Sequence, residues 1–240
     1  MKINKKLLII SAILTMLIIV IVVSVFARKS VSLIDSGKSS VNISTTGIIA
    51  QSYAAEKLPT WQDGDKIFGS SNAPLKIFVY EDYASIYSAN LADTLYKIST
   101  EYGNQVAVIV RPYSKGSSFT FLAAAAVDCA GAQGKWQEMR SLIFSGVKNG
   151  KFMAADSNTE AQQIGLNVDS YKACLTKVQK SGKIEQTTKD EIATIIQGAP
   201  TMFVGEEMIL GARPYDNYVD SNGDKIEGLK QVVERKLSVK

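Results

Sequence analysis

The chain has 240 residues, of which 46% are hydrophobic and 21% are charged, and its formal net charge is +4. It contains no histidine and two cysteines, which excludes Ser-His-Asp and Cys-His catalysis and leaves too few soft ligands for an ordinary structural zinc site, so we expect no metal and no cofactor. Five of the 27 basic residues lie in the first 29 positions, which contain no acidic residue. The rest of the chain has 22 basic and 23 acidic residues, so it lacks the excess of positive charge that nucleic-acid binding needs.

The first 29 residues form an apolar segment with basic flanks. Residues 7–27 are apolar apart from Ser11, Thr15 and Ser24, and a helix of this length crosses a hydrocarbon core of about 30 Å. The slight excess of cations before the run favours a cytoplasmic N-terminus. We predict a single-pass anchor in the cell membrane, with the C-terminal domain extracytoplasmic. The alternative is a cleaved signal peptide, which would make the protein secreted; such peptides have apolar cores of about 7–15 residues.

Residues 30–59 are predicted to be a flexible tether. Ser, Thr and Gly dominate this segment up to about residue 52, and residues 53–58 are compatible with one helical turn. A coil of this kind would hold the following domain on the order of 30 to 35 Å from the bilayer.

Residues 60–240 are predicted to form one globular domain. Residues 75–80 are an apolar run rich in β-branched and aromatic residues, which favours a buried strand. A helix is expected from Ser85 to Tyr102, with Gly103 as its stop, and residues 105–110 predict a second buried strand. This order indicates a βαβ unit with two parallel strands.

The second half of the domain is predicted to be a helical insert followed by a hairpin and a helix. Residues 118–197 are helical in pattern throughout, with breaks at glycines. Residues 201–204 and 208–210 predict a hairpin, and residues 225–237 predict a closing amphipathic helix.

Several separated motifs in this order resemble the DsbA-like family of extracytoplasmic disulfide oxidoreductases, which have a thioredoxin-like α/β fold with a helical insert. The matching segments are residues 72–83, 85–88, 133–136, 171–175, 198–204 and 211–215. Where the family has Cys-x-x-Cys at the start of a helix, this chain has Ser85, Ile86, Tyr87 and Ser88. The resemblance also implies that Pro200 is a cis-proline beside this helix, and that Cys129 and Cys174 form a second, non-catalytic disulfide.

Serine at both cysteine positions removes the chemistry of the family. In such a fold the helix N-terminus stabilises the thiolate that attacks a disulfide, and a hydroxyl cannot replace that nucleophile. We interpret Ser85 as the N-cap of its helix and Ser88 as a small, partly buried hydroxyl. Acyl transfer by Ser85 would need a base; the chain has no histidine, and no lysine is near in sequence. Glu81 and Asp82 are interpreted as solvated residues at a strand end.

The proline loop predicts a second function, peptide binding, which does not need thiols. In this fold, residues next to the cis-proline pair with an extended peptide by strand addition, which the resemblance assigns to Ala199 and Thr201 around Pro200. Ile86 and Tyr87 complete the predicted peptide-binding surface. We therefore predict a redox-inactive protein that binds an extended peptide or a protein partner in the cell envelope.

Two alternatives remain open at this point. The chain could be a disulfide oxidoreductase that uses Cys129 and Cys174 as its redox pair, although an extracytoplasmic pair is expected to be a structural bridge. The serines could also have been engineered into an active parent. Whether the chain is an enzyme is therefore undecided by its sequence.

Overall fold

The computed structural model describes residues 52–54, 57–113, 118–151, 157–181 and 195–239, all of which belong to one compact unit. The predicted anchor and most of the predicted tether lie outside the described residues. Within the ranges above, no helix combines the length and the apolar character that crossing a membrane requires.

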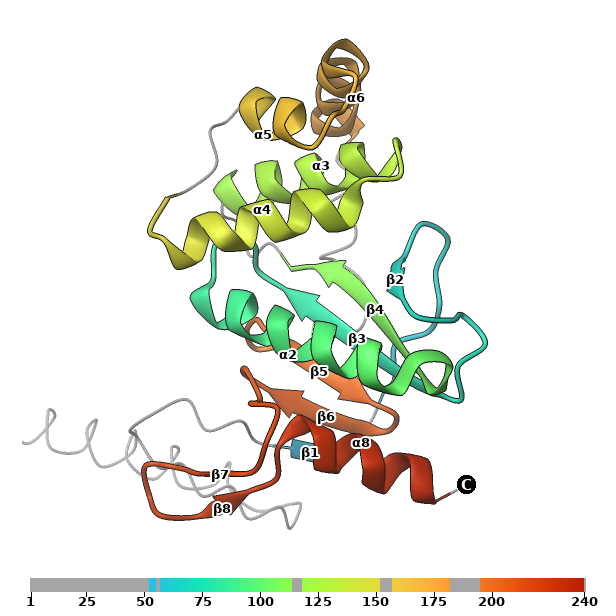
Figure 1. Cartoon of the computed structure of the whole chain (residues 1–240), viewed down its shortest axis with the longest axis vertical. Coiled ribbons are helices and arrows are strands. Elements are labelled where there is room, and N and C mark those ends of the chain that lie inside the picture. The colour runs from blue at the N-terminus through green and yellow to red at the C-terminus, as the bar shows by residue number, and fades with distance from the viewer. Residues whose placement is uncertain (1–51, 55–56, 114–117, 152–156, 182–194, 240) are drawn as a thin grey trace, which may run out of the picture. The chain divides into compact units, whose positions relative to one another are not determined.

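The described chain contains a mixed sheet of six strands in the order β1-β6-β5-β3-β4-β2 (Figure 1). The strands are β1 (Ser52–Ala54), β2 (Lys66–Phe68), β3 (Leu75–Glu81), β4 (Val106–Pro112), β5 (Thr201–Val204) and β6 (Glu207–Leu210). β3 and β4 are parallel, and the connection between them contains α2 (Ile86–Tyr102) and a 3-10 turn at Gly103–Gln105. The predicted βαβ unit and the predicted hairpin are both confirmed.

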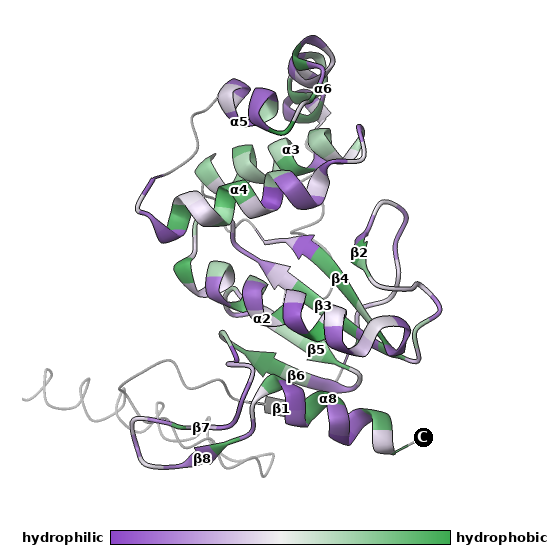
Figure 2. Ribbon diagram, viewed as in Figure 1, coloured by the Kyte–Doolittle hydropathy of each residue, from purple (hydrophilic) through white to green (hydrophobic). Residues whose placement is uncertain are grey.

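The central strand β3 contributes to a hydrophobic core on each side of the sheet. Its residues Ile77 and Val79 pack with apolar side chains of α2 and of α8 (Leu229–Ser238). Phe78 and Tyr80, which alternate with them, pack on the opposite side with residues of β4 and β5. Because both faces are covered, apolar side chains fill the consecutive positions Ile77–Val79 of β3 rather than alternating ones. Figure 2 shows a similar pattern in β4, which is green up to its purple arrowhead.

The insert helices form a third hydrophobic core, to which Tyr83, Ala89 and Ala92 in and before α2 also contribute. Its helices are α3 (Ser118–Gly131), α4 (Trp136–Lys148), α5 (Asn158–Gln163) and α6 (Val168–Ser181). Cys129 of α3 and Cys174 of α6 form a disulfide with a Cα–Cα distance of 5.7 Å, so the predicted pairing is confirmed. The predicted insert was too long at its end: the described residues 195–200 are not helical, and residues 182–194 lie outside the described residues.

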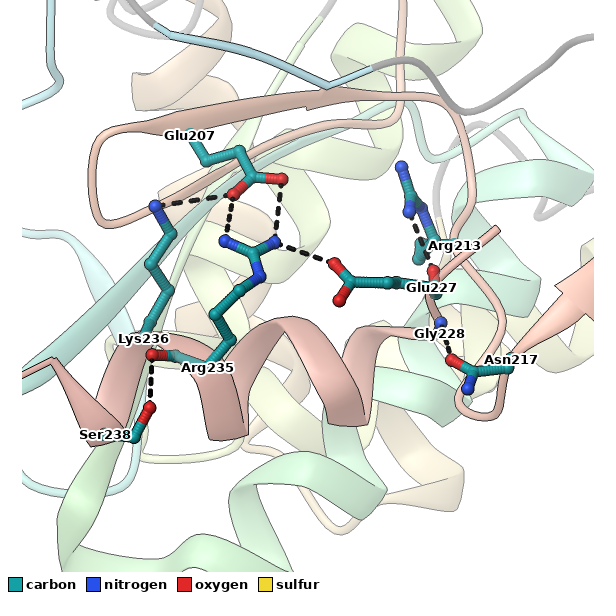
Figure 3. Close-up of polar contacts among 8 residues, drawn as sticks. All are labelled: Glu207, Arg213, Asn217, Glu227, Gly228, Arg235, Lys236 and Ser238. Atoms are coloured by element: carbon teal, nitrogen blue, oxygen red, sulfur yellow. Dashed lines mark hydrogen bonds and ion pairs between the residues drawn. The ribbon is translucent and has the colours of Figure 1, made fainter. Parts of the chain in front are cut away.

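The predicted start of the closing helix at residue 225 is wrong. Lys225 and Ile226 form β8, which pairs with β7 (Tyr218–Val219), and α8 begins only at Leu229. The preceding Gly228 donates its N–H to the side chain of Asn217 (Figure 3), and a Cβ at this glycine would lie 2.2 Å from the backbone of Asp216. This close approach lets the loop around residue 215 accept hydrogen bonds from the first turn of α8, which sets where the helix starts.

In addition to β7 and β8, two short strands of the six-stranded sheet were not predicted. β1 lies in the segment predicted as a tether and pairs with β6 along Ser52–Ala54, so Tyr53 and Ala54 are in a strand and not in the helical turn suggested for residues 53–58. β2 pairs with the outer edge of β4. A three-residue strand has too few positions for an alternating pattern, so its pairing depends on the edge that the rest of the sheet offers.

A buried ion pair joins the insert to the sheet. Glu81 at the end of β3 is fully buried and accepts two hydrogen bonds from Arg140 of α4, one of them 2.9 Å long from Nε to Oε2. The interpretation of Glu81 as a solvated residue was therefore wrong. The Arg140 guanidinium also stacks over the rings of Phe68 and Phe144. Burial alone would lower the pKa of Arg140, but Glu81 raises it, so the arginine stays charged.

Replacing both Cys129 and Cys174 by alanine should destabilise the domain. The bridge closes a loop across 45 residues, and in the chain-entropy model its loss costs about 4 kcal/mol in the free energy of unfolding. Urea unfolding of the full chain in detergent, followed by circular dichroism, measures this cost. Unchanged urea midpoints in the variant, and in the wild type with reductant, would contradict it.

Substituting Arg140→Met should destabilise the domain more than the removal of an exposed ion pair does. The variant leaves Glu81 buried without its partner, at a cost of roughly 3–5 kcal/mol. The double substitution of Glu81 and Arg140 by methionine should recover most of this loss, because no buried charge remains. The matched control is Lys148→Met on the same helix, whose ion pair with Asp93 is exposed and should contribute below about 1 kcal/mol. Equal urea midpoints for the two single variants would contradict the role of Glu81.

Candidate functional site

Strand register brings the two predicted parts of the site to the same end of the sheet. β3 ends at Glu81, and after a four-residue loop α2 starts beside this end. β5 runs antiparallel to β3 and pairs Thr201 with Tyr80, so Pro200 lies one step farther, at the end of the sheet where α2 begins. The Ala199–Pro200 peptide bond is cis, as the resemblance implied.

Ser85 is the N-cap of α2, as interpreted from the sequence. Its backbone is extended, with φ −94° and ψ 126°, and its Oγ accepts a hydrogen bond of 3.4 Å from the N–H of Ser88. The Ser85 carbonyl accepts the first helical hydrogen bond from Ala89 at 3.0 Å. Among the described residues, no basic side chain hydrogen-bonds the Ser85 hydroxyl. Within the part of the chain that the structure describes, the site therefore offers no base for acyl transfer by Ser85.

Ser88 has a structural role inside the loop that precedes α2. It is fully buried, and its Oγ accepts a hydrogen bond of 3.1 Å from the N–H of Asp82. Asp82 in turn accepts hydrogen bonds from the N–H of Ala84 at 2.8 Å and from the hydroxyl of Thr120 at 2.6 Å. Both serines are thus used to shape the start of the helix.

The proline loop presents one residue with available backbone groups. The Pro200 carbonyl accepts a hydrogen bond of 2.8 Å from Gly211, and Thr201 is buried between its strand partners Tyr80 and Leu210. Ala199 is only partly buried, and within the described part of the chain neither its N–H nor its carbonyl has a hydrogen-bond partner. An extended ligand could therefore pair with Ala199, while Thr201 already belongs to the sheet.

The first turn of α2 exposes two large apolar side chains. Ile86 is 42% exposed and Tyr87 is 48% exposed, and both follow directly after the N-cap. No acidic residue lies in this first turn, so the positive end of the helix dipole is not compensated there. The exposed surface at the start of α2 is therefore apolar. The proline loop at the same end of the sheet adds the available N–H and carbonyl groups of Ala199.

At the end of β3, next to this surface, the buried carboxylate of Glu81 is paired with an arginine. The loop from Asp82 to Ser85 follows directly on Glu81, which is held by Arg140. Burial raises the pKa of Tyr83, with a smaller contribution from Glu81, so this phenol stays neutral. Among the described residues, no three cysteine, aspartate or glutamate side chains converge as ligands of a metal ion would.

Sequence reasoning missed Arg140 and Thr120, which support the site from the insert. Arg140 could have been noticed as a charge on the buried face of α4, beside Met139, Ile143 and Phe144. Thr120 shows no such signal, because a threonine near a helix start is common and its partner Asp82 is 38 residues away in sequence.

Known proteins share this fold and part of this sequence. The family described as thioredoxin matches residues 62–220, more than half of the chain. BdbD from Bacillus subtilis in its oxidised form is 17% identical with a TM-score of 0.58, over 73% of this chain and 94% of that chain. The thiol-disulfide exchange protein alpha-DsbA2 from Wolbachia pipientis is 15% identical with a TM-score of 0.56, over 74% of this chain and 87% of that chain.

A curated relative is the Na⁺/H⁺ antiporter NhaA 1 of Salinispora arenicola, which is 24% identical over 163 residues. The match covers 67% of this chain and 24% of the antiporter, so the chain spans about a quarter of the length of this relative. With a matching family over residues 62–220, a cis-proline beside the α2 N-cap, and a helical insert between β4 and β5, the chain belongs to the thioredoxin family, in its DsbA-like form.

Proposed function

We propose that this chain is a membrane-anchored, extracytoplasmic thioredoxin-family protein that binds an extended peptide or protein segment without exchanging disulfides. The observation that carries this proposal is the end of the sheet to which strand register brings the first turn of α2, with Ile86 and Tyr87, and the proline loop, with Ala199. It combines exposed apolar side chains with available backbone groups at a place where both cysteine positions carry serine.

The serines argue against thiol exchange at this surface. Exchange needs a thiolate that attacks a disulfide sulfur and forms a mixed disulfide. The Ser85 hydroxyl instead accepts a hydrogen bond from the backbone of Ser88, which caps α2, and the Ser88 hydroxyl accepts one from Asp82. Both groups stabilise the helix start, so the shape of the binding surface is kept without its redox chemistry.

The geometry supports strand addition at Ala199. A peptide in extended conformation can accept from the N–H of Ala199 and donate to its carbonyl, as in other proteins that bind peptides at a sheet edge. Each such hydrogen bond contributes a net of roughly 0.5–1.5 kcal/mol. The exposed side chains of Ile86 and Tyr87 would add affinity by burying apolar surface.

An extracytoplasmic, membrane-attached location is supported by two observations. The Cys129–Cys174 disulfide is typical of an oxidising compartment outside the cytoplasm. The curated relatives that match part of this chain are named as antiporters, which are membrane proteins, so domains of this kind occur in chains attached to membranes. The apolar residues 7–27 would provide the anchor here.

The alternative function, redox chemistry at Cys129 and Cys174, is less well supported. Cys129 is fully buried in the core of the insert, and Cys174 packs against the same core. Burial shields the Cys129 sulfur from an attacking thiolate, although Cys174 is only partly buried. The bridge therefore fits a structural role better than a catalytic one.

Substituting Tyr87→Ala should weaken binding to an extended chain that has no thiols. Reduced and carboxymethylated ribonuclease A is a suitable probe, because it is unfolded and cannot form a mixed disulfide. Affinity measured by fluorescence anisotropy should fall about tenfold, which corresponds to about 1.4 kcal/mol. The matched control is Tyr96→Ala, since Tyr96 is 64% exposed on the same helix but lies away from its first turn. An equal loss in both variants would count against the proposed surface.

The wild-type chain should not accelerate the reduction of insulin by dithiothreitol. The double substitution Ser85→Cys with Ser88→Cys should introduce this activity, because the uncompensated N-terminus of α2 lowers the pKa of a thiol at residue 85. The turbidity caused by the precipitating insulin B chain measures the activity of the wild type and of the double variant. If the wild type were active and lost its activity when Cys129 and Cys174 were replaced by alanine, the alternative function would be established instead.

A further inference from the structure

The four-residue loop between β3 and α2 runs along the helical insert. Just before it, Glu81 at the end of β3 accepts hydrogen bonds from Arg140 of α4. Within it, the ring of Tyr83 packs against Phe144 of the same helix, with 5.4 Å between the ring centroids. Figure 1 shows α3 and α4 beside the ends of β3 and β4, next to the start of α2. The insert therefore borders the surface that we propose as a binding site.

The carboxylate of Asp82 lies at the centre of this contact. Its Oδ1 atom accepts a hydrogen bond of 2.6 Å from the hydroxyl of Thr120, near the start of α3, and one of 2.8 Å from the N–H of Ala84. The backbone of Asp82 is bonded as well. Its carbonyl accepts a hydrogen bond of 3.0 Å from the N–H of Ser85, and its own N–H donates to the Ser88 hydroxyl. One residue thus joins the insert to the N-cap of α2.

The hydroxyl of Thr120 fixes the direction in which the Asp82 carboxylate points. Thr120 is fully buried, so its side chain has a single surrounding in which to place its donor. A hydrogen bond from a hydroxyl to a carboxylate is charge-assisted, and such bonds are shorter and stronger than those between neutral groups. Asp82 is only partly exposed, so water would replace a lost donor incompletely. Without this hydroxyl, the turn that carries Ala84 and Ser85 would lose its contact with α3.

We infer that Thr120 is a positioning residue for the proposed peptide-binding surface, and that through it the insert sets how tightly this surface binds an extended chain. This inference rests on the function proposed above. Ile86 and Tyr87 follow directly after the N-cap, so a shift of the loop at Asp82 moves both exposed side chains together. The placement of this first turn beside Ala199 then depends on a hydroxyl that is 38 residues from its partner in sequence.

A coupling of this kind is reciprocal. If the bond between Thr120 and Asp82 favours the loop conformation that binds a peptide, a bound peptide favours that bond to the same extent. An extended chain at Ala199 should therefore also tighten the loop. The expected sign is slower hydrogen exchange at Ala84 and Ser85, because the N–H groups of both residues are bonded to Asp82.

Substituting Thr120→Val in the full chain, kept in detergent, removes the hydroxyl and retains the shape of the side chain. Affinity for reduced and carboxymethylated ribonuclease A should fall about fivefold, which is at the low end of typical couplings between sites. Thr120→Ser, which keeps the donor, should recover most of this affinity. The matched control is Thr176→Val on α6, where an exposed hydroxyl donates to the carbonyl of Lys172 at 3.1 Å and its loss should leave the affinity unchanged.

Two further measurements separate positioning from a general loss of stability. In an Asp82→Ala background, Thr120→Val should cause no further loss of affinity, because the hydroxyl acts through that carboxylate. Hydrogen exchange followed by mass spectrometry should be faster over residues 82–87 in Thr120→Val without a peptide, and unchanged there in Thr176→Val. If Thr120→Val were unfolded by circular dichroism, Thr120→Ala compared with Thr120→Ser supplies the same test.

The outcomes distinguish the inference from the function on which it rests. Wild-type affinity and wild-type exchange in Thr120→Val, with weakened binding in Tyr87→Ala, would overturn the inference and keep the proposed function. Equal losses in Thr120→Val and Thr120→Ser, or losses that add in the Asp82→Ala background, would overturn it too, since a hydroxyl that acts through Asp82 gives neither. A wild-type chain that does not bind the probe would contradict the proposed function and the inference with it.

Discussion

The antiparallel pairing of β5 with β3 is the constraint on which the arrangement of this protein depends. It pairs Thr201 with Tyr80, and so it places Pro200 and Ala199 at the end of the sheet where α2 begins. The two segments are more than 110 residues apart in sequence, and no local interaction would bring them together. The hydrophobic cores on both faces of β3 hold this register, because a slip by one residue would turn Phe78 and Tyr80 to the wrong side.

The insert contributes to the site from a distance. Its helix α4 supplies Arg140, which neutralises the buried Glu81 at the end of β3, and its helix α3 supplies Thr120, which bonds Asp82 in the loop before α2. The disulfide between α3 and α6 stabilises the insert itself. These contacts shape the loop before α2, and with it the surface that we propose as a binding site.

The sequence by itself determined the order of the central strands, the helical insert and the hairpin, through apolar patterns that depend on near neighbours. Through motifs that resemble the family, it also determined the N-cap at Ser85, the cis-proline loop and the pairing of Cys129 with Cys174. Tertiary structure alone decided that Glu81 is buried against Arg140, that Ala199 rather than Thr201 has available backbone groups, and that α8 starts at Leu229. These features depend on contacts between residues far apart in the chain, whose energies outweigh local preferences, and no local pattern records which distant partner a side chain or a backbone group will meet.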